Sequence, residues 1–563
     1  MISLAVPQLV AAQSEADKAA GDYLAGRSAM FASDFETAAR HFTGALMRDR
    51  SNQALMDSLV TAQLALGEIE RAYPVAERME ALGAKSQFSH LVIVAHMIAE
   101  GDYAAILERE TGDQPIGHLV DGLVNAWAHM GKGSVSDALA AFDALSEENG
   151  LRGFALYHKA LALSQVGDFE GAEALFAGEG AGTAMFSRRG AIARAEILSQ
   201  LGRNDDALNL LVDTFGSSFD PGLTTVADRL ASGETLPFSQ AATVRDGMAE
   251  VFYSIGNVLN GEIADDYALI YARIAIYLRP DHIDSLLLAA QLLDNLGQYD
   301  LAIATYKQVP ADSPDHHAAE LGRAEALRRA AKPDAAIEVL EQLTRDYPTL
   351  PLVHSSLGDL FRQQEEYASA VAAYDRALEF TEAGDGSEWF LRYARGISHE
   401  RLDQWEQAEA DFRTALELRP DQPQVLNYLG YSLVEKRIKL DEALEMIERA
   451  VEARPDSGFI VDSLGWVLYR LGRYDEAVGH MERAVELMPV DPVVNDHLGD
   501  VLWAVDRKRE AEFQWKRALS FIDPEDTDGE ADPDRIRRKL EVGLDVVLAE
   551  EGSEPLKVAN GDD

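Results

Sequence analysis

The sequence contains no cysteine at any of its 563 positions. Disulfide bonds, thiol nucleophiles and cysteine-ligated zinc are therefore excluded, although this absence does not distinguish an oxidising from a reducing compartment. Basic residues are also scarce, since 51 Lys and Arg stand against 96 Asp and Glu, for a formal net charge of −45. A field of this sign repels phosphate backbones and anionic lipid, so neither nucleic acid nor an anionic membrane surface is expected as a partner.

The sequence also lacks an apolar run of about 18 residues, so no segment is expected to span a bilayer. The apolar N-terminus ends in Val10, Ala11 and Ala12, small residues with the spacing of a signal-peptidase site. The basic region that precedes the apolar part of such signals is missing. Residues 1–14 are therefore interpreted either as the remnant of a secretory signal, which predicts a periplasmic or envelope-associated protein, or as the frayed N-terminus of a cytoplasmic one.

What the chain does have is internal repetition, because a small residue recurs near the start of each predicted second helix. The series comprises Ala268, Ala302, Ala336 and Ala370 at intervals of 34 residues, then Ala408, Ala443, Ala477 and Ala511, with a weaker series upstream at Ala38, Ala72, Ala104, Ala138, Ala172 and Ala207. Small residues let two helices approach closely, and prolines such as Pro420, Pro455 and Pro489 stop the second helix. The chain is therefore predicted to be a stack of helix–turn–helix units that share one continuous core.

Two further features accompany this series between about residues 265 and 524. The pairs Leu357-Gly358, Leu429-Gly430, Leu464-Gly465 and Leu498-Gly499 lie in the first helices, and the large residues Tyr374, Phe412, Met481 and Trp515 lie four positions after the alanines. This pattern resembles the tetratricopeptide repeat family. The resemblance implies an all-α fold, a right-handed superhelical solenoid of helix–turn–helix repeats with a C-terminal capping helix.

The spacing also predicts how the chain is organised. Residues 15–215 form a degenerate N-terminal lobe of repeats, residues 216–240 an irregular connection rich in Gly, Ser, Pro and Thr, and residues 241–524 a C-terminal lobe. An acidic linker over 525–532 leads to a capping helix over 533–550, followed by a disordered tail over 551–563. Ile536, Leu540, Leu544 and Val547 have helical spacing, so this helix is expected to cover the last repeat with one apolar face.

No motif of a catalytic, cofactor or metal site is recognised. The stretch HERLDQW at 399–405 begins like a zinc-protease helix, but Asp403 stands where the second histidine would be. Glycine-rich phosphate loops and nucleophile elbows are missing, and the repeats leave no room for a catalytic domain. The protein is therefore not expected to be an enzyme or to bind a cofactor.

The resemblance instead implies a protein-binding groove lined by the first helices of successive repeats. Its concave-facing positions would hold Asn427, Tyr428 and Tyr431 in one unit, Phe459, Asp462, Ser463, Trp466, Tyr469 and Arg470 in the next, and Asp496, His497, Asp500 and Trp503 in the third. Exposed aromatic side chains beside polar groups are typical of binding hot spots. The alternative is that Trp466 and Tyr469 pack between helices, as aromatics at helical spacing commonly do.

The charges of this predicted groove indicate its ligand. Relatives that bind chaperones hold a C-terminal carboxylate with Lys, Arg and Asn, whereas here Asp462, Asp496 and Asp500 face Arg470 almost alone. A basic or neutral polypeptide is therefore the expected ligand.

The run from residue 426 to 511 is also similar to the C-terminal repeats of long bacterial envelope adaptors that bind carboxy-terminal processing proteases and deliver cell-wall hydrolases to them. That resemblance implies a scaffold that raises the effective concentration of protease and substrate. The lipobox of those adaptors is absent. A cytoplasmic co-chaperone or regulatory module is the alternative.

Overall fold

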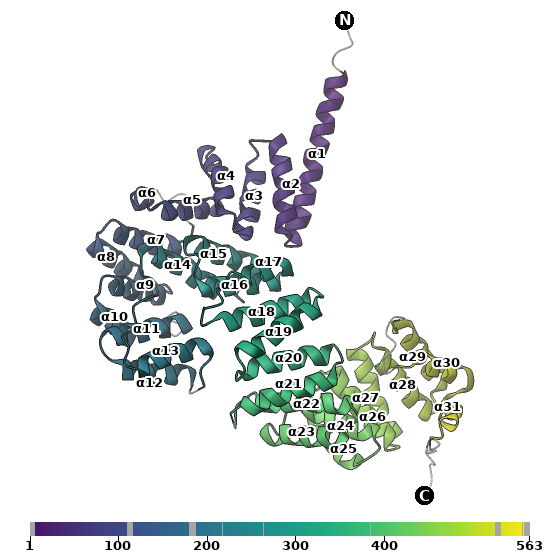
Figure 1. Cartoon of the computed structure of the whole chain (residues 1–563). Coiled ribbons are helices and arrows are strands. Elements are labelled where there is room, and N and C mark those ends of the chain that lie inside the picture. The colour runs from purple at the N-terminus through teal and green to yellow at the C-terminus, as the bar shows by residue number, and fades with distance from the viewer. Residues whose placement is uncertain are drawn as a thin grey trace. The chain divides into compact units, whose positions relative to one another are not determined.

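The computed structural model describes residues 6–109, 116–178, 187–216, 218–262, 264–382, 384–523, 531–553 and 556, with side chains from residue 18 onward. This part of the chain forms the helices α1 to α31 and no β-strand (Figure 1). The prediction of an all-α repeat fold is confirmed. Residues 1–5, most of the predicted acidic linker and most of the predicted tail lie outside the described residues.

The chain divides into two compact units, here called unit 1 (residues up to Tyr347) and unit 2 (Pro348 onward). Unit 1 contains α1 (Val6–Phe31), α2 (Phe35–Arg48), α3 (Gln53–Leu66), α4 (Ile69–Ala81), α5 (Gln87–Glu100), α6 (Tyr103–Glu108), α7 (His118–Gly131), α8 (Val135–Ser146), α9 (Arg152–Gln165), α10 (Phe169–Ala177), α11 (Arg188–Gln200), α12 (Asn204–Phe215), α13 (Pro221–Ala231), α14 (Val244–Leu259), α15 (Asp265–Leu278), α16 (Ile283–Asn295), α17 (Tyr299–Tyr306), α18 (His316–Arg329) and α19 (Pro333–Asp346).

Unit 2 contains α20 (Pro351–Gln363), α21 (Tyr367–Phe380), α22 (Glu388–Arg401), α23 (Trp405–Leu418), α24 (Pro423–Glu435), α25 (Leu440–Ala453), α26 (Gly458–Arg470), α27 (Tyr474–Leu487), α28 (Pro492–Ala504), α29 (Lys508–Phe521), α30 (Pro533–Val542) and α31 (Leu544–Glu550). Within it, each even-numbered helix from α20 to α28 packs against the odd-numbered helix that follows, so these pairs are the repeats.

The boundary between the units differs from the expected one at 216–240. That segment holds a further helix, α13, which begins with Asp220 as N-cap and Pro221 as its first residue. After it the chain turns back, because α14 packs on α7 and α9 while α15 packs on α3 and α5. These returning helices bind residues 241–347 to the N-terminal lobe and move the boundary to Tyr347.

Within each repeat of unit 2, a glycine of the first helix faces a large side chain of the second. A Cβ atom on Gly358 would lie 2.8 Å from the Tyr374 ring, and one on Gly465 would lie 2.7 Å from Met481 Cγ. The register alanines of the second helices are fully buried, Ala477 and Ala511 among them. The glycine of each Leu-Gly pair thus contacts the large residue that lies four positions after the register alanine. Because glycine has no side chain, the large side chain of the second helix can pack directly against the backbone of the first.

The predicted capping helix over 533–550 is two helices. Gly543 adopts a φ of 88° between α30 and α31, and a Cβ there would lie 2.6 Å from the Trp503 ring. A residue other than glycine would be strained by this backbone and would also collide with Trp503. Ile536, Leu544 and Val547 are buried, as expected for side chains that cover the end of the repeat stack.

Replacing Gly499 with alanine tests the contact between the paired helices. A Cβ at this position would collide with the fully buried Trp515 ring, so Gly499→Ala should lower the free energy of unfolding of unit 2 by about 1–3 kcal/mol. Gly479 lies mid-helix in α27 with nothing near its missing Cβ, so Gly479→Ala should be neutral or stabilising by about 0.5–1 kcal/mol. Urea denaturation of both variants measures the difference, and equal effects would contradict the proposed packing.

Candidate functional site

In unit 1, helices of the same unit cover the first helices of the early repeats. Helix α15 lies against α3 and α5, and α14 lies against α7 and α9 (Figure 1). Arg273 of α15 donates from Nε to the carbonyl of Ala65 at 3.2 Å, and the Tyr277 hydroxyl hydrogen-bonds to Glu70. The face of α3 to α9 that would otherwise be open to a partner is therefore occupied by α14 and α15.

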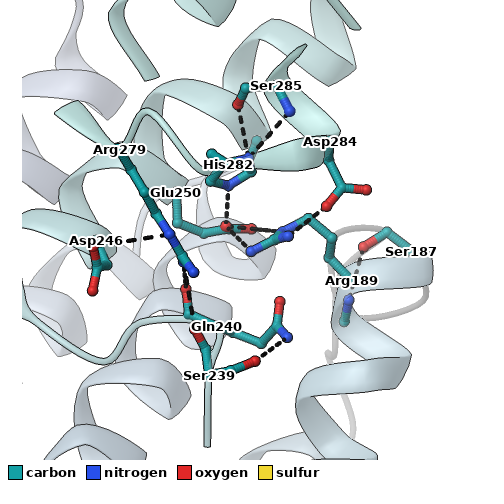
Figure 2. Close-up of polar contacts among 12 residues, drawn as sticks. Ser187, Arg189, Ser239, Gln240, Asp246, Glu250, Arg279, His282, Asp284 and Ser285 are labelled. Atoms are coloured by element: carbon teal, nitrogen blue, oxygen red, sulfur yellow. Dashed lines mark hydrogen bonds and ion pairs between the residues drawn. The ribbon is translucent and has the colours of Figure 1, made fainter. Parts of the chain in front are cut away.

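A buried polar network holds this packing together (Figure 2). Glu250 of α14 accepts hydrogen bonds from Arg189 Nε of α11 at 3.1 and 3.0 Å, and from the Tyr157 hydroxyl of α9 at 2.9 Å. His282, the N-cap of α16, lies 3.1 Å from the same carboxylate through Nε2. Arg189 also pairs with Asp284 at 2.5 Å, so its charge lies between two carboxylates.

Ser285, His282 and Glu250 have the order of a hydrolytic triad, with Ser285 Oγ 2.9 Å from His282 Nδ1. Their environment argues for a structural role. Ser285 is 0% exposed, and His282 Nδ1 also accepts the backbone N–H of Ser285 at 3.1 Å as the cap of α16. Glu250 in turn is saturated by Arg189 and Tyr157. No substrate could reach this serine. The hydrogen bonds and ion pairs of the network instead link α9, α11, α14 and α16.

Burial and charge shift the pKa values of this network in opposite directions. Burial alone would raise the pKa of Glu250, but Arg189 and His282 outweigh it and hold that pKa well below its usual range. Burial lowers the pKa of His282, and it lowers the pKa of His158, which lies 3.3 Å from Ser254, to about 4. Both histidines are therefore neutral at pH 7, and Glu250 is ionised.

In unit 2 the structure corrects part of the predicted groove. Trp466 and Tyr469 were expected to be exposed, and this is wrong, because each is only 8% exposed. The Trp466 ring stacks between His497 at 3.9 Å and Tyr469 at 4.9 Å, and its Nε1 donates to Glu435 at 2.7 Å. The imidazole that covers Trp466 comes from the next repeat. The alternative of packing between helices is the correct one for these two residues.

The aspartates expected to contact a partner are engaged within the chain as well. Asp462 lies 3.0 Å from His497 Nδ1. Asp496 and Asp500 accept hydrogen bonds from Lys539 of α30 at 2.8 and 2.6 Å, and the Lys539 side chain is fully buried. The predicted residues on α28 therefore hold the C-terminal cap.

Two further predicted residues, Trp503 and Arg470, also contact other side chains of the same chain. Trp503 donates from Nε1 to Asp545 of α31 at 2.9 Å. The Arg470 guanidinium lies 5.9 Å from the centre of the Trp466 ring. Both side chains are partly buried, and Trp503 lines a second cleft of about 670 Å³ together with Tyr474, Lys508 and Asp545.

An open cleft of about 390 Å³ lies between the first helices of four successive repeats in unit 2, α22, α24, α26 and α28. Its lining contains six of the residues predicted to face the groove, which are Asn427, Tyr428, Tyr431, Phe459, Asp462 and Ser463. Phe459 is 63% exposed, and the buried Oδ1 of Asn427 has no hydrogen-bond partner among the described residues. The cleft therefore offers an exposed aromatic ring, two further aromatic rings and an unused hydrogen-bond acceptor.

The repeat pattern did not predict the remaining lining residues of the cleft, which are Glu400, Arg401, Ser432, Glu435, Asp491, Val493 and Val494. Glu400 and Arg401 end α22, one repeat before those considered. Asp491 is the N-cap of α28 and accepts the Val494 N–H at 2.9 Å. The Asp-Pro start of α28 was a usable signal for Asp491, since a first-turn proline after an aspartate marks a capped helix start.

Models of the tetratricopeptide repeat match residues 123–183, 296–360, 393–458 and 462–489. These segments are tetratricopeptide repeats, and they include most of the helices that line the cleft.

Two named proteins resemble part of the chain. TPR repeat-containing protein PA4667 of Pseudomonas aeruginosa is 29% identical over 176 residues, which is 31% of this chain and 28% of that protein. The human protein O-mannosyl-transferase TMTC1 is 27% identical over 170 residues, which is 30% of this chain and 19% of that protein. The chain thus spans less than a third of the length of either relative.

Solved structures are similar at low identity. A chain of the APC/C hetero-tetramer Cut9–Hcn1 has a TM-score of 0.39 at 14% identity, covering 92% of this chain and 95% of that one. A tetratricopeptide repeat protein of Parabacteroides merdae has a TM-score of 0.37 at 17% identity, covering 46% and 98%. Neither similarity bears on function.

Within the described residues, none of the helices has both the length and the apolar character that crossing a membrane requires. The same part of the chain holds no cluster of three His, Asp or Glu side chains placed to bind a metal ion.

The stability of unit 1 should depend on pH through His158. Because its pKa is about 4 in the folded state and about 6.5 when unfolded, the unfolded state binds the proton more tightly. Stability is complete above about pH 6.5 and falls by roughly 3 kcal/mol as the pH drops toward 4. His158→Gln should remove this part of the pH dependence, whereas His118→Gln, at an exposed position of the same unit, should keep it. Urea denaturation between about pH 7 and 4.5 measures both; identical profiles would exclude His158 as the cause.

Trp466→Ala should behave as a core mutation. Removal of a ring packed between His497 and Tyr469 is expected to lower the free energy of unfolding by about 3–5 kcal/mol. Leu464→Ala, at a 5% exposed position of the same helix, should cost about 2–5 kcal/mol. Phe459→Ala provides the surface control and should change stability by less than about 0.5 kcal/mol. A Trp466→Ala protein as stable as the Phe459→Ala protein would refute the burial of this ring.

Proposed function

We propose that this protein is a non-catalytic scaffold that binds a segment of a partner polypeptide in the cleft of unit 2. The observation that carries the proposal is the cleft itself, where Phe459 stands 63% exposed beside Tyr428 and Tyr431. Aromatic side chains at the centre of a concave surface are the usual anchors of protein interfaces. Asn427 adds a buried Oδ1 that has no hydrogen-bond partner among the described residues.

Unit 1 contributes differently to this proposal. Its corresponding helix faces are filled by α14 and α15, and its buried Arg189 and Glu250 pair with each other. A partner of unit 1 would therefore bind an outer surface. Tetratricopeptide repeats in general serve as interaction scaffolds, which supports the assignment of a binding function to the repeats of this chain.

We extend the proposal to a more specific role, the adaptor of a carboxy-terminal processing protease in the bacterial cell envelope. The resemblance of residues 426–511 to such adaptors motivates it, and two separate compact units would allow a protease and its substrate to bind at the same time. Co-purification of the tagged full chain with a protease of this class from cell envelopes, and not from cytosol, tests this role. A stable complex found only with cytosolic chaperones would favour the co-chaperone alternative.

Phe459 and Phe513 form a matched pair for testing the cleft. Both are exposed phenylalanines of unit 2, at 63% and 59%, but Phe513 lies on α29 outside the cleft. Phe459→Ala should weaken partner binding by about 2 kcal/mol, or roughly 30-fold, while Phe513→Ala should have little effect. A photoreactive phenylalanine analogue placed at each position in cells would identify the bound protein by mass spectrometry, and calorimetry would then measure its affinity. Equal labelling and equal affinity for the two positions would place the binding surface elsewhere.

A further inference from the structure

Two first helices of unit 2, α26 and α28, make a similar polar contact through the same helix position. The fifth residues of α24, α26 and α28 are Asn427, Asp462 and Asp496. Asp496 accepts hydrogen bonds from Lys539 of α30, and Asp462 is bonded to His497 of α28. In both cases a nitrogen donor from the next even-numbered helix, α28 or the capping helix α30, satisfies an oxygen at this position.

Asn427 is the exception in this series. Its Oδ1 is buried and has no hydrogen-bond partner among the described residues. The donor would have to come from α26, where Ser463 occupies the sixth position that His497 occupies in α28. Ser463 is too short to replace an imidazole, and its hydroxyl bonds back to the Phe459 carbonyl at 2.9 Å. The cleft therefore lies where a donor side chain is missing.

The charges around this gap favour a cationic donor. Glu400, Glu435, Asp462 and Asp491 line the cleft, against Arg401 as the basic residue of the lining. Three of these carboxylates are engaged: Glu435 accepts the Trp466 N–H, Asp491 accepts the Val494 N–H, and Asp462 pairs with His497. The pKa of His497 is raised because nearby carboxylates outweigh its burial. The lining still carries an excess of negative charge, and a carboxylate ligand would be repelled.

The chain itself shows what such a surface binds. Helix α30 reads PDRIRRKLEV and is strongly basic in an otherwise acidic protein. Its Lys539 is fully buried against Asp496 and Asp500, with its ammonium 5.7 Å from the centre of the Trp515 ring. The helices of unit 2 thus already bind one lysine of the same chain between carboxylates and an aromatic ring.

We propose that the cleft binds a basic segment of a partner polypeptide, whose lysine or arginine donates to Asn427 Oδ1 between Glu400 and Glu435. The neighbouring apolar residue of the segment packs on Phe459 and Tyr431. This assignment rests on the proposed binding function and adds to it the chemical class of the ligand.

A short fluorescein-labelled peptide of lysine, leucine and serine serves as the probe for the full-length protein at about 150 mM salt, where distant charges are screened. It should bind measurably more tightly than its counterpart with glutamate in place of each lysine. The double variant Glu400→Gln/Glu435→Gln should weaken binding about tenfold and reduce its salt dependence. The control Glu445→Gln/Glu452→Gln changes the net charge equally at exposed positions of α25 and should bind as the wild type does.

Ser463→His provides a second variant, in which an imidazole from α26 fills the gap beside Asn427 as His497 fills that beside Asp462. It should abolish peptide binding while circular dichroism and melting show a folded protein. If this variant fails to fold, the glutamine variants alone decide the question.

The proposal is overturned if the glutamate peptide binds equally well, or if the control double variant loses as much affinity as the cleft double variant. The results also distinguish an error in the chemical class of the ligand from an error in the position of the binding site. When Phe459→Ala weakens binding of the natural partner but Glu400→Gln/Glu435→Gln does not, the cleft is a binding site and its ligand is not basic. When neither substitution has an effect, the binding site itself is refuted.

Discussion

The close approach of the two helices in each repeat is the contact on which the rest of unit 2 depends. It requires a glycine on the first helix at the point where a large side chain of the second helix packs against it. Gly465 fulfils this requirement for Met481, and Gly396 fulfils it for Phe412. Once the helices are fixed at this distance, side chains at the same position of successive first helices come within hydrogen-bonding range of the next repeat. Asp462 of α26 and Asp496 of α28 make such contacts, whereas Asn427 at the same position of α24 has an unpartnered Oδ1 among the described residues and lines the cleft.

The two units differ in whether the inner faces of their helices are covered by other helices of the same unit. In unit 1 the chain returns on itself, and a buried Arg189–Glu250 pair and a partly buried Arg189–Asp284 pair link the inner faces of α11, α14 and α16. Burying these charges is costly unless every partner is present, which makes such a network a strong determinant of one particular packing. In unit 2, α30 covers the last repeat, and a preceding repeat keeps the exposed aromatic ring of Phe459.

Local patterns were enough to predict the repeats. The alanine register, the glycine positions and the buried face of the cap depend on residues within one helix pair, and they were correct. Where the sequence failed, the decisive contact came from another repeat. Trp466 occupies a concave-facing position, but its burial depends on His497, 31 residues further on. Likewise, nothing near Asp496 indicates that Lys539 satisfies it, and the lobe boundary depends on the return of α14 to α7, which no local spacing records.

The return of α14 and α15 has a consequence for how the protein folds. A repeat stack with contacts only between neighbours can nucleate anywhere and grow outward, because each step closes a short loop. Unit 1 cannot form in this way, since Arg273 bonds to the carbonyl of a residue 208 positions earlier and Tyr157 bonds to a carboxylate 93 positions later. Contacts of such long sequence separation slow folding. During synthesis the inner faces of α3 to α9 therefore remain uncovered until residue 278 has left the ribosome, and unit 1 should fold as a single cooperative body while unit 2 adds its repeats one after another.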